Sequence, residues 1–124
     1  MKRGSFSLKS RAASFRHAFR GVAALFRTQP NAWIHLGATV AVVAAGFAFR
    51  LPRAEWLWLI AAICAVWVAE AFNTALEFLA DAVSTGHHPL IGKAKDVAAA
   101  AVLLASLAAA IVGVMVFWPR LRTW

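Results

Sequence analysis

The sequence predicts an all-α integral membrane protein, with an N-terminal amphipathic surface helix followed by three transmembrane helices. Of its 124 residues, 62% are hydrophobic and the mean hydropathy is +0.70, whereas soluble domains are about 45–50% apolar. Three long apolar runs are separated by short polar connections. The net charge is +8, and seven Lys and Arg residues precede residue 30. We expect a single membrane domain over residues 1–124.

Residues 1–30 are predicted to form a helix that lies in the headgroup region. On a helical wheel, apolar residues gather at about 40–100° and basic residues at about 160–200°. The apolar set is Leu8, Phe15, Phe19, Val22 and Phe26, and the basic set is Lys9, Arg16, Arg20 and Arg27. This pattern is typical of an interfacial helix, and packing on a partner protein is the alternative. Pro30 should end or bend the helix, because it pushes Gln29 out of the helical region.

The first predicted span covers 31–49 and is short for a bilayer, which needs about 20 apolar residues. His35 lies near its start. We expect His35 to be a headgroup-level histidine with a backbone partner rather than a metal ligand. Gly37, Ala41 and Ala45 recur every four residues and are expected to let another helix approach closely.

The second predicted span covers 56–81, and its first fourteen residues carry no charge. Glu70, Asn73 and Glu77 then fall at about 160°, 100° and 140° on the helical wheel, so they share one narrow face. Asp81, at about 180°, extends this face toward water. A charged side chain in lipid costs roughly 2.5–3.5 kcal/mol by insertion scales, which makes these carboxylates a functional-site hypothesis.

A second polar connection is expected from Ser84 to Lys95, before a third span over 97–118. Asp96 is expected to help cap that span. Counting Lys and Arg gives nine on the side of the N-terminus and the 81–96 loop, against four on the other side. The positive-inside rule therefore predicts a cytoplasmic N-terminus in a multi-pass protein. The carboxylate end of the second span then faces the cytoplasm, where ATP is.

The polar residues suit phosphoryl transfer, although the motifs of soluble kinases are absent. The run 92–94 lacks the spacing and the hydroxyl of a Walker A motif. Glu77 lies nearer the cytoplasmic surface and suits a divalent ion, whereas the deeper Glu70 suits a base near a lipid hydroxyl. Lys95 and Asp96, which precede the next span, are expected to lie at the same membrane depth as these carboxylates. Phosphoryl transfer depends mostly on such positioning and charge neutralisation.

Several runs of the chain resemble the small prokaryotic diacylglycerol kinase family, which includes the undecaprenol kinases. The specific runs are 69–77, 88–90 and 94–103, with further similarity over 19–21 and 27–31. The E-x-x-N-x-x-x-E element with A-K-D downstream is a specific signal. The resemblance implies a homotrimer with active sites between subunits, in the bacterial cytoplasmic (inner) membrane. It also implies Mg²⁺-dependent transfer of the ATP γ-phosphate to a lipid alcohol, with diacylglycerol preferred and undecaprenol as the alternative.

The resemblance also assigns roles to individual residues. Glu70 would be the catalytic base and would contact the lipid together with Ala99, while Asn73 and Asp81 would support the site. Glu77 would bind the metal. The nucleotide neighbours would be Gln29, Glu77, Gly86, His87, His88, Lys95, Asp96 and His17.

Gln29 departs from the family pattern, because many members carry a glutamate there that shares the metal. An amide offers one neutral oxygen, so we expect weaker metal binding by Gln29, or replacement of this ligand by Asp81 or a water. Two further hypotheses stand beside the lipid kinase. One is a non-enzymatic trimeric membrane scaffold whose polar face only drives assembly, and the other is a small ion or proton pathway.

Overall fold

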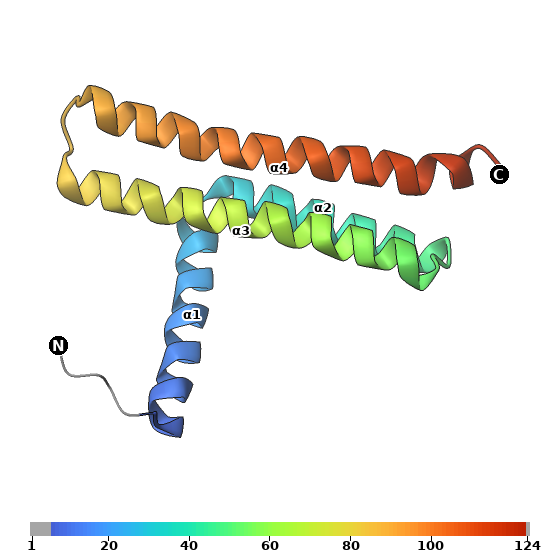
Figure 1. The fold of residues 1–124 in the computed structure, drawn as a ribbon, viewed down its shortest axis with the longest axis horizontal. Helices are drawn as coiled ribbons and strands as arrows, with labels where there is room; N and C mark the ends of the chain where they lie inside the picture. The colour runs from blue at the N-terminus through green and yellow to red at the C-terminus, as the bar shows by residue number, and fades with distance from the viewer. Residues whose placement is uncertain (1–5, 124) are drawn as a thin grey trace.

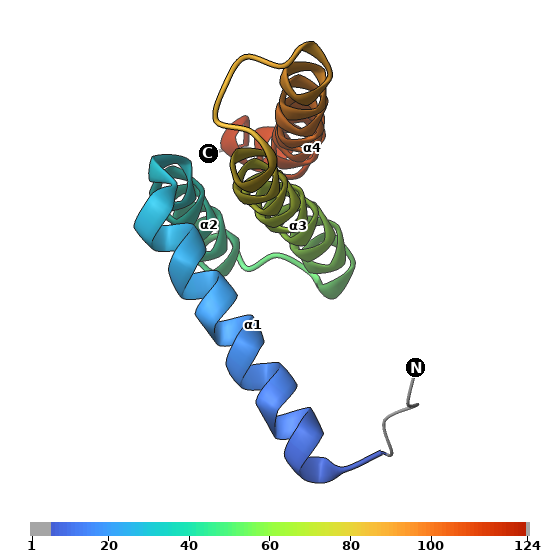
Figure 2. The ribbon, with the colours of Figure 1, turned by 90° about the vertical axis from the view of Figure 1, so that its left-hand side faces the viewer.

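The computed structural model describes residues 6–123, so the first five residues of the predicted surface helix lie outside it. The described chain forms four helices: α1 (Leu8–Thr28), α2 (Pro30–Ala48), α3 (Arg53–Val83) and α4 (Pro89–Leu121). Helices α2, α3 and α4 run side by side, and α1 leaves them at a steep angle (Figure 1). Seen from the end, α3 lies between α2 and α4 (Figure 2).

Helices α2, α3 and α4 are each long and apolar enough to cross a membrane, which confirms the predicted fold class. Two of them are longer than the spans expected from the apolar runs, with 31 residues in α3 and 33 in α4. At about 1.5 Å per residue, each exceeds a hydrocarbon core of about 30 Å. Both helices therefore continue beyond the apolar layer.

The predicted connection from Ser84 to Lys95 is wrong, because α4 begins at Pro89. His88 is the N-cap, and its side chain accepts a hydrogen bond from the Leu90 backbone N–H at 3.3 Å. Pro89 suits the first helical position, where no N–H is needed. Asp96 therefore does not cap the helix but lies about two turns inside it. The charged residues here therefore lie within the helix and not at its start.

The chain turns a corner at Gln29, which is extended between α1 and α2. Pro30 is the first residue of α2. This confirms the predicted break, because proline disfavours the helical region for the residue before it. The Trp33 indole donates a hydrogen bond to the Phe26 carbonyl oxygen at 3.0 Å. The Phe26 ring also packs against the rings of Trp33 and Trp67, with centroids 5.1 and 5.6 Å apart. These contacts fix the C-terminal end of α1 to α2 and α3.

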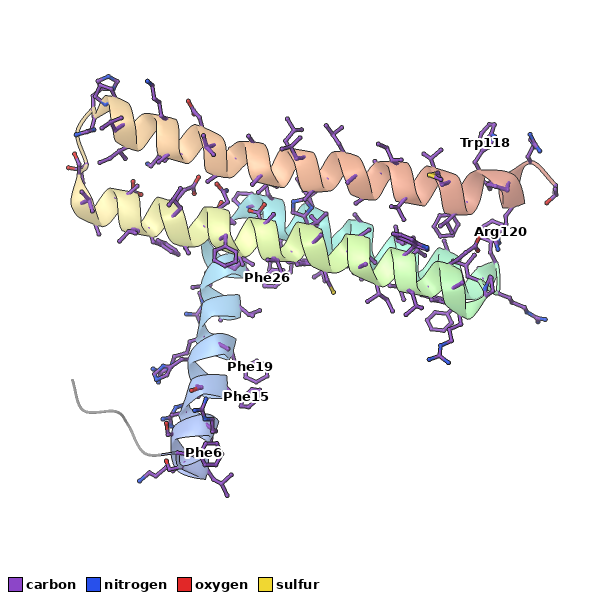
Figure 3. All side chains as sticks on the ribbon, viewed as in Figure 1. Phe6, Phe15, Phe19, Phe26, Trp118 and Arg120 are labelled. Atoms are coloured by element: carbon purple, nitrogen blue, oxygen red, sulfur yellow. The ribbon has the colours of Figure 1, made fainter. Side chains whose placement is uncertain are left out.

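The remainder of α1 exposes its apolar face. Leu8, Phe15 and Phe19 are all largely exposed, as is Phe6 just before the helix. Phe15 and Phe19 project to the side along which the three long helices extend (Figure 3). This geometry matches a helix that rests on a membrane surface with its apolar face toward the lipid.

The far end of the bundle, around the α2–α3 turn, holds an apolar cluster. Leu51, Leu59 and Val116 are buried there, with Trp56 and Phe117 packed against them. An ion pair between Glu55 and Arg120 links the start of α3 to the end of α4. These contacts hold α3 and α4 together at this end within one chain.

A Schellman motif ends α2, with Arg50 in the left-handed region at φ 51°. The Leu51 N–H donates to the Gly46 carbonyl oxygen, and the Arg50 N–H donates to that of Phe47, both at 3.1 Å. A Cβ added at Gly46 would lie 2.6 Å from the Trp56 ring. Gly46, which the small-residue repeat omitted, is thus the residue of α2 that permits close helix approach.

Two members of the predicted repeat, Gly37 and Ala41, have no such role within the described chain. A Cβ at Gly37 would meet nothing within 4 Å, and Ala41 is exposed. The close approach of α2 and α3 therefore occurs at Gly46, one residue after the last alanine of the repeat.

Candidate active site

The polar face of α3 is turned into the bundle around Glu70, which is 1% exposed. The Thr74 hydroxyl is also buried and donates to the Glu70 carbonyl oxygen at 2.9 Å. Neither carboxylate oxygen of Glu70 has a hydrogen-bond partner within the described part of the chain. A buried carboxylate without such partners is expensive. This environment favours a reactive group over a structural one.

His35 of α2 faces this carboxylate, with its Nε2 atom 3.5 Å from Glu70 Oε2. Within residues 6–123, it is the only basic group in ion-pair range of Glu70. The expectation of a headgroup-level histidine did not foresee this contact. The sequence could have suggested this contact, because the two residues lie at similar distances from the α2–α3 turn. Along two antiparallel helices, His35 and Glu70 lie roughly 20 and 27 Å from that turn.

The next two turns of α3 carry Asn73 and Glu77, which are both partly buried. Asn73 Oδ1 has no hydrogen-bond partner within residues 6–123. Gln29 Nε2 donates to Glu77 Oε2 at 3.1 Å. The corner at Pro30 therefore brings together the two residues that the family resemblance assigns to the metal.

Asp81 lies one turn farther along α3 and pairs with Lys95 of α4, at 2.8 Å between Oδ1 and Nζ. Lys95 therefore meets Asp81, and not Glu70 or Glu77. A cavity of about 140 Å³ lies beside this pair at the α3–α4 turn. Its lining includes the predicted site residues Asp81, Gly86, His87, His88 and Lys95.

Three predicted site residues stand apart from these clusters. His17 is exposed on α1, and Asp96 and Ala99 are exposed on α4. Within the described residues, no group of three or more His, Cys, Asp or Glu side chains could hold a metal ion. Glu77 and Gln29 therefore remain the metal ligands to consider, as one carboxylate and one amide oxygen.

A second cavity of about 260 Å³ lies among α2, α3 and α4. Its lining is mostly apolar, but His35, Thr39 and Ser106 contribute polar groups. His35 thus borders this cavity and also faces Glu70. The imidazole has open space beside it in the middle of the bundle.

Comparison with known proteins adds independent evidence. Residues 16–117, which include every predicted site residue, match the model of the prokaryotic diacylglycerol kinase family. Undecaprenol kinase from Bacillus subtilis (strain 168) is 38% identical over 108 residues, which cover 87% of this chain and 88% of that protein.

Two diacylglycerol kinases are also similar. The protein from Synechocystis sp. is 43% identical over 109 residues, which cover 87% of this chain and 62% of that protein. The protein from Escherichia coli (strain K12) is 31% identical over 103 residues, which cover 82% of this chain and 72% of that protein. These relatives favour a kinase over a scaffold or an ion pathway. The chain belongs to the prokaryotic diacylglycerol kinase family and is an integral-membrane lipid kinase.

Proposed function

We propose that this kinase transfers the γ-phosphate of ATP to the hydroxyl of diacylglycerol, giving phosphatidic acid, with Glu70 as the catalytic base. The observation that carries this proposal is the buried carboxylate of Glu70, which has no hydrogen-bond partner within residues 6–123 and lies on a helix that can span the membrane. A carboxylate without hydrogen bonds is free to accept a proton. Its depth suits an acceptor whose hydroxyl lies at the lipid surface.

In the proposed step, the lipid hydroxyl oxygen attacks the γ-phosphorus and its proton passes to Glu70. The bond from the γ-phosphorus to the β–γ bridging oxygen breaks, and ADP leaves with that electron pair. Glu70 then releases its proton to water. Proton removal by a positioned base contributes typically about 10²–10⁴-fold to a rate. Asn73, with its free Oδ1 beside Glu70 on the same helix face, supports this end of the site.

We assign the nucleotide to the cytoplasmic end of α3 and α4. Lys95 supplies a cation for phosphate oxygens, and the cavity beside Asp81 supplies a place for part of the nucleotide. Gly86, His87 and His88 line that cavity from the connecting turn. Asp96 and His17, both exposed, would reach the nucleotide only where a neighbouring copy completes the site. This requirement agrees with the proposed homotrimer with active sites between subunits.

Glu77 and Gln29 fit a magnesium ion. Mg²⁺ is usually held by one or two carboxylates, with waters and substrate phosphates as the remaining ligands. Glu77 offers a carboxylate, and Gln29 is close enough to turn its amide oxygen toward the same ion. Asp81 is committed to Lys95, which argues against it as the replacement ligand. Charge neutralisation on the β- and γ-phosphates is the chemistry that Mg²⁺ supplies when bound.

The proposed setting is the bacterial inner membrane, with the N-terminus in the cytoplasm. Phe15 and Phe19 project from α1 toward the side occupied by the spans (Figure 3), and the basic stripe of α1 suits anionic headgroups. Ala99, exposed on α4, would contact the lipid acceptor. Undecaprenol is the second candidate acceptor, because the undecaprenol kinase from Bacillus subtilis matches over nearly the full length of both chains.

Parallel assays with the two lipids test the acceptor. The purified full chain, in mixed micelles with Mg²⁺ and ATP, should phosphorylate diacylglycerol at least about 10-fold faster than undecaprenol, as measured by phosphate transfer to lipid. The reverse preference would assign undecaprenol instead. Glu70→Gln should reduce transfer to either lipid by roughly 10³-fold, whereas Val40→Ala, an exposed change on α2, serves as the control. Phosphorylation of neither lipid would overturn the proposal.

A further inference from the structure

We propose that His35 is a positioning residue for the base, donating a hydrogen bond from Nε2 to one Glu70 oxygen and leaving the other to take the proton of the lipid hydroxyl. This inference rests on the proposed role of Glu70. A carboxylate on a flexible side chain has two equivalent oxygens and can rotate. An anchor on one oxygen reduces that freedom and aims the other.

The distance between the two groups suits such an anchor. His35 Nε2 lies 3.5 Å from Glu70 Oε2, and a shift of about half an ångström would bring it into hydrogen-bond range. The cavity of about 260 Å³ beside His35 gives the imidazole room to make that shift. The buried Thr74 hydroxyl is also close in sequence, but it is committed to the Glu70 carbonyl oxygen.

The backbone and ring of His35 are held from two helices. The Thr39 hydroxyl donates to the His35 carbonyl oxygen at 2.7 Å, and the Trp67 indole donates to the Thr39 hydroxyl oxygen at 3.0 Å. The Trp67 ring also packs edge-on to the imidazole, with centroids 6.1 Å apart. Phe26 of α1 covers the same indole. A histidine so placed faces the carboxylate as part of a supported arrangement.

The chemistry predicts which kinetic constant should change. His35 acts on the orientation of Glu70 and makes no contact with either substrate in this assignment. Its loss should therefore slow the chemical step without weakening the binding of ATP or lipid. A misplaced base can lower a rate by about 10²-fold.

The test compares side chains at position 35 that differ in their donor. His35→Leu fills a similar volume without a donor and should lower kcat by about 10–100-fold, with both KM values within about twofold of wild type. His35→Gln places an amide N–H near the position of Nε2 and should recover most of that loss. His35→Asn offers the same amide on a shorter side chain and should recover less. Val40→Ala is the control on the same helix, and thermal unfolding in detergent checks that each variant folds.

Wild-type kcat in His35→Leu, or a loss confined to the KM values, would overturn the proposal. So would equal activity of folded His35→Gln and His35→Asn, a comparison that stands even where the leucine variant does not fold. Failure of the proposed function has a different signature. In that case wild type phosphorylates no lipid, or Glu70→Gln keeps full activity, and the role of His35 fails with it.

Discussion

The two ends of the bundle use charged residues in opposite ways. At the far end, Glu55 of α3 pairs with Arg120 of α4 beside an apolar cluster that contains Leu59 and Val116. At the other end, Asp81 and Lys95 pair across the same two helices but are more exposed. Glu70, between the two pairs, is buried with no hydrogen-bond partner in the described chain.

The two ends therefore separate residues that stabilise the fold from residues that are available for chemistry. At the far end, Glu55 pairs with Arg120 beside an apolar cluster of the same chain, which favours stability. At the site end, the Glu70 carboxylate and the Asn73 amide oxygen have no hydrogen-bond partner within residues 6–123, although such groups are costly to bury. A substrate or a metal ion would bind these free oxygen atoms. Changes at the far end should therefore affect stability, and changes at the site end should affect activity.

The largest expected effect separates activity from stability at Glu70. Glu70→Gln should reduce lipid phosphorylation by roughly 10³-fold, because the proton acceptor is lost. Its midpoint of thermal unfolding should stay equal or rise, because a buried charge without hydrogen bonds is removed. Kinase assays and unfolding in the same detergent measure both. A marked fall in stability would mean that Glu70 holds the fold together.

The next largest effect is a loss of stability on substituting Gly46, at the far end of the bundle. Gly46→Ala should destabilise the protein by about 1–3 kcal/mol, because the new methyl group overlaps the Trp56 ring. Gly37→Ala, on the same helix in open space, should be neutral or gain up to about 1 kcal/mol of helix propensity. Reversible unfolding in mixed micelles measures the difference. Equal stabilities would show that the Gly46–Trp56 contact does not limit packing.

The two ion pairs offer a direct contrast. Arg120→Gln should lower the free energy of unfolding by about 1–2 kcal/mol, a value between those of exposed and buried ion pairs. Activity per folded molecule should not change. Asp81→Asn should lower stability by no more than about 1 kcal/mol. It should instead raise the KM for ATP about 2–5-fold, because Lys95 loses its orienting partner. The opposite pattern in unfolding and kinetics would reverse the assignment of the two ends.

The smallest effect concerns the turn at the far end. Arg50 occupies the left-handed region, which costs a residue with a Cβ roughly 1–2 kcal/mol. Arg50→Gly should therefore raise stability by about 0.5–1 kcal/mol after the entropy of glycine is included. Arg50→Ala keeps the Cβ and should not show this gain. Activity should match wild type in both variants, because the turn is remote from Glu70.

The sequence by itself determined the features that depend on local pattern. Composition and apolar run length predicted three spans, and the two stripes of residues 8–27 predicted the surface helix. Pro30 predicted the break after α1, because proline restricts the residue before it. The helical period placed Glu70, Asn73 and Glu77 on one face. These properties arise within one segment, so no knowledge of its neighbours is needed.

Only the tertiary structure decided which side chains on different helices meet. It turned His35 toward Glu70, matched Lys95 with Asp81, and set Gly46 against Trp56. Such pairings depend on how far each helix is rotated and shifted along its neighbour. Apolar faces allow many rotations and shifts with similar burial, and side-chain packing selects among them. The period of one helix does not encode that choice, which is why the partner of the central carboxylate appeared only in the folded chain.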